Sequence, residues 1–169
     1  LIDGQFDTNS SGGYAVAIAS SMVMQGGTFE ARGSTITVGA NWDASAGAFN
    51  MGTSSVSLTG TGTVENTSAN RFYHVSLANS GYTTFMNSHI YVEESISFLG
   101  GVITDGASFY DINIYPEFED SLYINTSTIM NYLLFKIYAQ TTTVNIPSFG
   151  DYPSLQLFSD ITEDTTFYL

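Results

Sequence analysis

Apolar and hydroxyl-bearing residues alternate along much of this chain, and this alternation constrains the fold more than any other feature. It is clearest in Ser34–Val38, Ser55–Thr59 and His74–Leu77. Shorter alternating segments follow at Ile96–Phe98, Asp111–Ile114, Ser121–Ile124, Val144–Ile146 and Ser154–Leu157. Successive residues of a β-strand point to opposite faces, so each segment offers one apolar and one polar face. The pattern predicts an all-β protein with many short strands.

Two weak internal repeats accompany the alternation. Arg71–Leu77 matches Ser108–Ile114 at an offset of 37 residues, and Gly26–Phe29 matches Gly100–Ile103. Self-similarity of this kind is typical of stacked β architecture. We therefore expect a β-solenoid, or an extended and curved β-sheet, with open edges. All 169 residues are expected to form one all-β domain, with a change of character near residue 115.

The best candidate for a helix is Ile129–Gln140, where Leu133, Leu134 and Ile137 could share one helical face. Its Tyr, Phe and Ile content and the three threonines that follow it favour a strand instead. The only tryptophan, Trp42, is expected to cap the core of the first sheet.

Charge excludes two classes of partner. The chain has 16 acidic residues and three basic ones, Arg32, Arg71 and Lys136, which gives a formal net charge of −13. Proteins bind nucleic-acid phosphates and anionic membrane surfaces mainly through Lys and Arg. We therefore expect no nucleic-acid partner, and an anionic membrane surface is a poor partner for the same reason. No apolar stretch approaches the roughly 20 residues of a membrane span. With no cysteine, neither disulfides nor thiolate metal sites can form.

Several motifs resemble those of secreted bacterial and archaeal surface proteins with Gly/Ser/Thr/Asn-rich repeats. They occur in the family's order at Gly26–Phe29, Ile36–Trp42, Gly47–Phe49, Gly52–Val64 and Phe72–Leu77. The resemblance covers about residues 26 to 115 and implies a β-solenoid or extended sheet, an extracellular location at the cell surface and no catalytic residues. The acidic, lysine-poor composition is similar, more loosely, to that of archaeal sheath and surface-layer proteins.

Catalysis has little support in the sequence. No Gly-x-Ser-x-Gly motif occurs, and the only possible bases for a serine nucleophile are His74 and His89. His74 alternates with Val75 and Leu77, which places it on the polar face of a strand, and His89 stands at a strand entrance. We therefore expect that the protein is not an enzyme and that it has no organic cofactor.

Acidic clusters are the strongest chemical candidates. Glu93 and Glu94 form one pair, and two further clusters contain Glu117, Glu119 and Asp120, and Asp160, Glu163 and Asp164. The last two clusters could bind calcium through oxygen ligands, hold a catalytic carboxylate pair, or simply keep an uncharged β surface soluble. Three sequons, at Asn9, Asn66 and Asn125, are candidate glycosylation sites.

The scarcity of lysine and proline bears on function, because these residues usually block the edges of sheets. Tyr14–Met24 and Ser95–Leu99 are uncharged and β-prone, the profile of segments that add to open strand edges. The sequence therefore predicts an extracellular structural protein whose copies polymerise edge to edge into a coat, sheath, surface layer or filament. The alternative is an adhesin, or a carbohydrate-binding segment of a larger surface protein or viral fibre, with exposed aromatic residues binding glycans.

Overall fold

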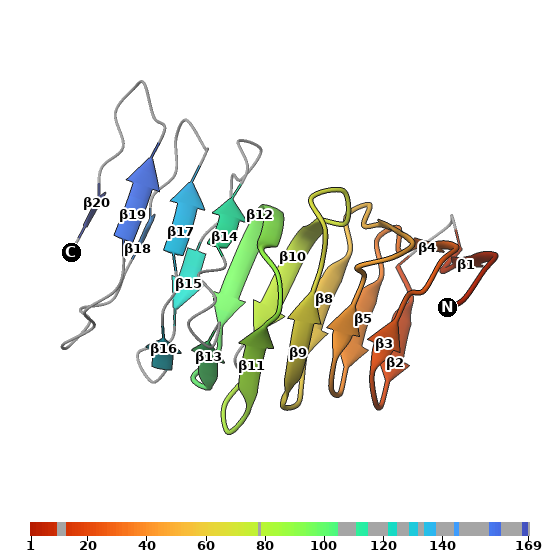
Figure 1. The fold of residues 1–169 in the computed structure, drawn as a ribbon, viewed down its shortest axis with the longest axis horizontal. Coiled ribbons are helices and arrows are strands. Elements are labelled where there is room, and N and C mark those ends of the chain that lie inside the picture. Colours follow the sequence, from red (N-terminus) through yellow and green to blue (C-terminus); the bar gives the residue numbers. More distant parts are fainter. Residues whose placement is uncertain are drawn as a thin grey trace.

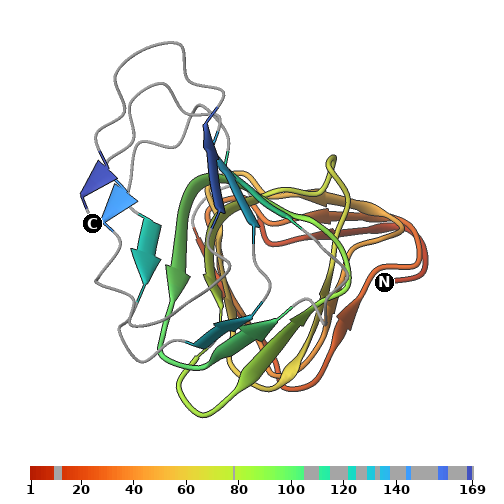
Figure 2. The same cartoon turned by 60° about the vertical axis from the view of Figure 1, so that its left-hand side comes forward.

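The protein is a β-solenoid, as the sequence predicts, and winds through about five turns (Figure 1). The computed structural model describes residues 1–9, 13–77, 79–104, 111–114, 122–124, 129–131, 134–137, 144–145, 156–159 and 167–168. These residues contain strands and turns but no helix. Seen close to the axis of the coil, successive turns lie over one another around a common interior (Figure 2).

Three parallel sheets form the walls. Sheet A contains β1 (Gln5–Asp7), β4 (Thr28–Glu30) and β7 (Ala48–Asn50). Sheet B begins with β2 (Ala15–Ile18), β5 (Thr35–Val38), β8 (Ser55–Leu58), β10 (Phe72–Leu77) and β12 (Ile90–Phe98). Sheet C contains β3 (Met22–Val23), β6 (Trp42–Asp43), β9 (Gly62–Glu65), β11 (Thr83–Met86), β13 (Val102–Thr104) and β16 (Ile129–Asn131).

Sheet B divides at β12, the longest strand. Its first half pairs with β14 (Asp111–Ile114), which continues to β17 (Leu134–Ile137) and β19 (Gln156–Ser159). Its second half pairs with β15 (Leu122–Ile124). A separate pair is formed by β18 (Val144–Asn145) and β20 (Phe167–Tyr168). The segment considered as a helix therefore forms the strands β16 and β17, as predicted.

The coil repeats about every 20 residues. Thr35 pairs with Ala15 on one side and with Ser55 on the other, and Val75 pairs with Val56 and Ile96. The similarity at an offset of 37 residues does not reflect the stacking of turns, because Val75 and its counterpart Ile112 pair with different segments of β12. The match between Gly26–Phe29 and Gly100–Ile103 is also not structural, because β4 belongs to sheet A and β13 to sheet C. Short apolar patterns recur on every wall, so similarity alone does not identify neighbours.

The alternation decides which side chains fill the interior. Ile36, Val56, Val75 and Ile96 occupy successive turns of sheet B and are at most 2% exposed. Their neighbours Thr37, Ser57, Ser76 and Ser97 stack in the outward column. Burial of the apolar column removes it from water, and the outward column keeps the sheet hydrated.

An aromatic column runs along the inner face of sheet A. Phe6, Phe29 and Phe49 pack edge to face, with ring centroids 5.1 and 5.6 Å apart. The column continues into Trp42, whose ring centroid lies 4.8 Å from that of Phe49 and 5.1 Å from that of Phe72. Trp42 is fully buried. It therefore lies inside the core, where it joins sheets A and C, rather than capping one sheet.

Candidate functional site

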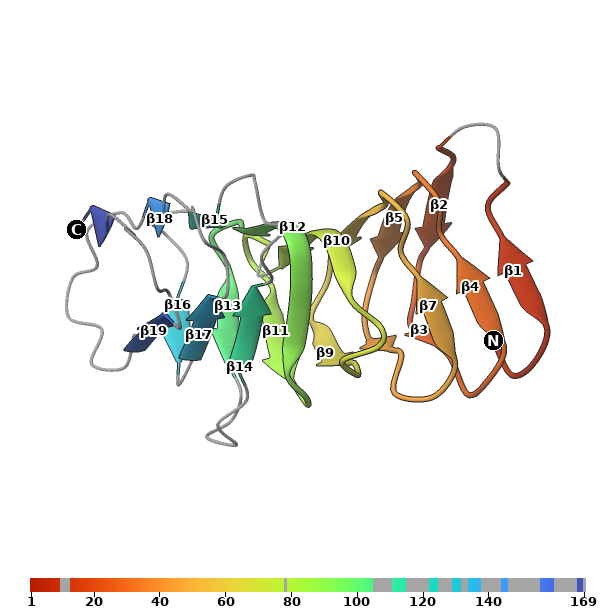
Figure 3. The same ribbon diagram turned by 90° about the horizontal axis from the view of Figure 1, so that it is seen from above.

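Sheet A stops at β7 because a side chain takes the place of the next strand. One turn after β7 the chain forms the loop of residues 67–70, and the buried Asn70 points back into the coil. Its Oδ1 accepts a hydrogen bond from the backbone N–H of Phe49 (2.8 Å), and its Nδ2 donates to the carbonyls of Ala44 (2.5 Å) and Gly47 (3.1 Å). The bonds to Phe49 and Gly47 satisfy backbone groups that a fourth strand would have paired, and the bond to Ala44 satisfies a carbonyl at the preceding corner. Figure 3 shows the three strands of sheet A at the N-terminal end of the coil.

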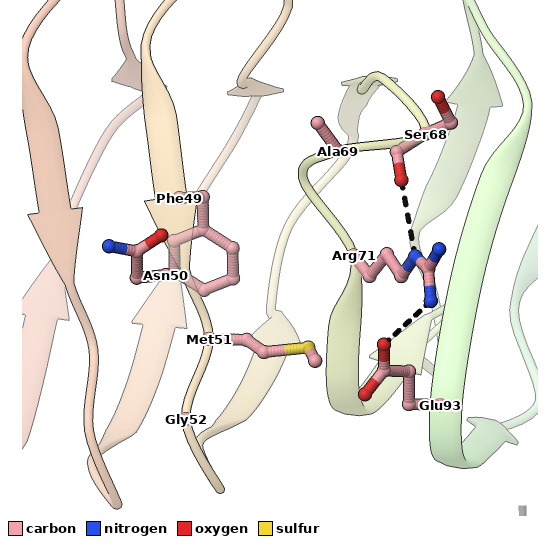
Figure 4. Close-up of a pocket in the computed structure, with 8 residues that line it drawn as sticks. All are labelled: Phe49, Asn50, Met51, Gly52, Ser68, Ala69, Arg71 and Glu93. Atoms are coloured by element: carbon pink, nitrogen blue, oxygen red, sulfur yellow. Dashed lines mark hydrogen bonds and ion pairs between the residues drawn. The ribbon is translucent and has the colours of Figure 1, made fainter. Parts of the chain in front are cut away.

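Beyond this edge lies a recess of about 410 Å³, which we call the sheet A recess. It is lined by Phe49, Asn50, Met51, Gly52, Ser68, Ala69, Arg71 and Glu93. One side is the end of β7, the other is the start of β10 and the middle of β12, and the loop of residues 67–70 borders it (Figure 4). Met51 extends from the β7 side toward Arg71 and Glu93 in the same view.

An ion pair fixes the polar side of the recess. Arg71 Nη1 donates to Glu93 Oε1 at 2.8 Å, and Arg71 Nε donates to the carbonyl of Ser68 at 3.2 Å. The Arg71 and Glu93 side chains are 33% and 20% exposed, respectively. Two bonds to different elements hold the guanidinium plane in one orientation, so the donors are placed before any ligand arrives.

A second candidate surface lies at the N-terminal end of sheet B. The carbonyls of Tyr14 and Ile18 accept hydrogen bonds from Thr35 N and Gly39 N of the next turn. Because alternate residues of a parallel strand bond to the same side, the backbone groups of Ala15 and Ala17 point away from β5. Among the residues that the structure describes, no strand pairs with β2 on that side. We call this side the β2 edge.

An apolar recess of about 360 Å³ adjoins the β2 edge. It is lined by Leu1, Phe6, Val16, Ile18, Ser21, Met22, Val23 and Phe29. Phe6 at the end of the aromatic column is 46% exposed, and Ile2 and Tyr14 are more exposed still. Tyr14–Met24 contains no charged residue and no proline.

The other segment expected to offer an open edge does not do so. Ser95–Leu99 lies mostly in the second half of β12, where Ile96, Ser97 and Phe98 pair with β10 on one side and with β15 on the other. Both sides of this strand are already occupied, so its uncharged, β-prone sequence reflects burial within the sheet. The expectation that it adds to another chain is wrong.

The two histidines lie where the alternation places them. His74 is on the outer face of β10, and its Nδ1 lies 2.7 Å from Ser95 Oγ on the neighbouring turn. His89 directly precedes β12. In the described part of the chain, no group of three or more His, Cys, Asp or Glu residues is arranged to hold a metal ion. None of the described residues forms a helix with the length and apolarity to cross a bilayer.

All six predicted cation ligands and one of the three sequons fall outside the part of the chain that the structure describes. The calcium candidates Glu117, Glu119, Asp120, Asp160, Glu163 and Asp164, and the sequon at Asn125, lie outside the described residues. Asn9 is exposed and has a positive φ of 83°. Asn66 is 6% exposed, and neither of its amide atoms has a hydrogen-bond partner. A glycan at Asn66 would have to be attached to Nδ2, which is buried in the folded chain. Glycosylation at the three sequons stays a prediction.

Sequence reasoning missed Asn70 and the Arg71–Glu93 pair as parts of a site. Arg71 was conspicuous as one of three basic residues, and Glu93 as part of an acidic pair, but they are 22 residues apart in the chain. A coil of about 20 residues would have predicted their contact. Comparison with known proteins finds no matching family model, no matching curated protein and no matching solved structure.

Proposed function

We propose that this chain is a structural subunit whose copies join through the β2 edge, in an extracellular coat, sheath, surface layer or filament at the cell surface. The observation that carries the proposal is the uncharged β2 edge beside an apolar recess. Ala15 and Ala17 offer backbone donors and acceptors, and Val16, Ile18 and Phe6 offer apolar surface next to them. A strand added from another copy would pair with the backbone donors and acceptors, and the same contact would bury the apolar surface.

Charge does not oppose contact between copies along the β2 strand itself. With 16 acidic and three basic residues, two copies repel one another wherever their acidic faces meet. The stretch Tyr14–Met24 contributes nothing to that repulsion, because it has no ionisable residue other than Tyr14. Contact through the β2 edge therefore adds no like-charge repulsion from this stretch, although residues 44–64 are also uncharged.

Replacement of Ala17 tests this proposal directly. Ala17→Pro removes an N–H on the open side of β2 and leaves the bonds to β5, which Tyr14 and Ile18 make, in place. Ala17→Thr keeps the N–H and adds an exposed hydroxyl, so it is the matched control. Sedimentation velocity and negative-stain electron microscopy over a range of concentrations measure assembly.

The wild type and Ala17→Thr are expected to assemble as concentration rises, and Ala17→Pro is expected to stay monomeric. A wild type that stays monomeric at every concentration would contradict the structural role. Assembly of Ala17→Pro equal to that of Ala17→Thr would show that copies meet through another surface. The same measurement with a chelator tests the calcium proposal, because a bridging cation requires assembly to fall when the cation is removed.

A further inference from the structure

The sheet A recess places an ion pair and an apolar side chain next to one another at the end of sheet A. Its volume of about 410 Å³ falls within the range of small-molecule pockets. Its lining combines the guanidinium of Arg71 and the carboxylate of Glu93 with the apolar surface of Met51 (Figure 4). In ligand sites, a few polar groups fix the orientation of the ligand, and the apolar surface beside them buries its carbon skeleton.

The charges of the recess select an uncharged ligand. Arg71 and Glu93 neutralise one another at 2.8 Å, so the recess offers hydrogen-bonding groups without a net charge. The acidic surface of the chain opposes an anion. A cation would have to compete with Arg71 for the Glu93 carboxylate. Arg71 is the one basic residue among the described residues of the lining, so a phosphate would meet no second positive charge from them.

We propose that the sheet A recess binds a neutral sugar residue of a glycan. A guanidinium and a carboxylate held side by side can each bind adjacent hydroxyl groups of a sugar ring, the first as donor and the second as acceptor. The C–H face of the same ring packs against Met51, which Figure 4 shows extending toward the ion pair.

This site does not depend on the β2 edge. The recess is formed by β7, the loop of residues 67–70 and β12, all away from β2 in the strand order. A monomer can therefore bind the sugar, and an assembly can form without it. The two proposals are separated by measuring binding on the Ala17→Pro variant as well as on the wild type.

The test is a binding measurement on the full chain with defined probes. Saturation-transfer NMR and titration calorimetry are carried out with the methyl glycosides of glucose, galactose and mannose, with N-acetylglucosamine, and with glucuronate as the anionic comparison. At least one neutral sugar is expected to bind, and more tightly than glucuronate. Failure of every neutral sugar to bind, or tighter binding of glucuronate, would overturn the proposal.

Three variants locate the site. Glu93→Gln keeps the size of the side chain and removes its charge, and Ala69→Trp fills the recess from the exposed loop without removing a polar group. Each is expected to weaken sugar binding about tenfold or more. Glu93→Gln does so because a hydrogen bond to a charged group is lost, and Ala69→Trp because the indole ring blocks access to the recess. Arg32→Gln, in the exposed pair with Asp7, is the control and is expected to bind as the wild type does.

Far-ultraviolet circular dichroism shows whether each variant keeps the β-solenoid. If Glu93→Gln and Ala69→Trp are folded and bind the sugar as tightly as the wild type, the sugar lies elsewhere and the inference is wrong. The two variants act by different means. If one of them fails to fold, the binding affinity of the other still tests whether the sugar lies in the recess.

Discussion

The carboxamide of Asn70 bonds to the backbone of Phe49 as a neighbouring strand would, with Oδ1 2.8 Å from Phe49 N. Its Nδ2 bonds to two carbonyls at the preceding corner, those of Ala44 and Gly47. One side chain thus ends sheet A inside the coil and leaves room for the sheet A recess beside it. The end of the sheet is closed by a specific residue rather than left open.

Asn70→Ala is expected to destabilise the fold by about 2–4 kcal/mol, because it leaves a buried N–H and two carbonyls without partners. Asn50→Ala removes one exposed bond, from Nδ2 to Glu30 Oε1, and is expected to change stability by less than about 0.5 kcal/mol. Urea unfolding measures both. Equal effects of the two replacements would contradict the role given to Asn70.

Phe72→Ala is expected to cost about 3–5 kcal/mol, because the ring is fully buried against Trp42 and Phe49. Phe85→Ala removes a ring that is 43% exposed and is expected to cost about 1 kcal/mol or less. Trp42, the only tryptophan, reports the transition through its fluorescence. A native emission spectrum typical of tryptophan in water would contradict the burial of Trp42 itself.

Gly60→Ala is expected to destabilise the coil by about 2 kcal/mol or more, because a Cβ there would overlap the backbone carbonyl of Gly39 on the preceding turn. Gly33→Ala is the matched control. A Cβ at Gly33 would lie 3.3 Å from Thr53 Oγ1, and that side chain can rotate away. Thermal unfolding compares the two variants, and a Gly60→Ala protein as stable as Gly33→Ala would show that the turns are not so closely stacked.

Asp7 is expected to titrate below its ordinary range, because hydrogen bonds from Arg32 and from the backbone N–H of Asn9 lower the pKa of its carboxyl. The contribution of the pair to stability is therefore present above the pKa of the unfolded chain and is lost as pH falls through the folded value. The effect is small, because both groups are exposed.

Carboxyl NMR titration measures the Asp7 pKa residue by residue. Arg32→Gln is expected to move the Asp7 pKa upward, toward its ordinary value, because the strongest stabilising bond is lost. Arg71→Gln, which alters a different ion pair, is expected to leave the Asp7 titration unchanged. An Asp7 pKa that is the same in the wild type and in Arg32→Gln would show that the pair does not persist in solution.

The sequence also predicted particular placements at the candidate sites, with mixed success. His74 lies on the outer face of its strand, as its alternation with Val75 indicated, and Tyr14–Met24 includes the strand that borders the β2 edge. Ser95–Leu99 has a similar composition but lies inside sheet B. Composition could not separate these two segments, because an edge strand and a strand buried between two others can both be uncharged and apolar.

The sequence by itself determined that the chain forms strands and which side of each faces the core, as in Ile36 and Thr37. That information is local, because neighbouring residues of a strand point in opposite directions. Only the tertiary structure decided which strands are neighbours, where sheet A ends at Asn70, and that Arg71 meets Glu93 across a recess. Those relationships depend on the length of one turn of the coil, which brings together residues about 20 positions apart and is set jointly by corners, glycine contacts and core packing.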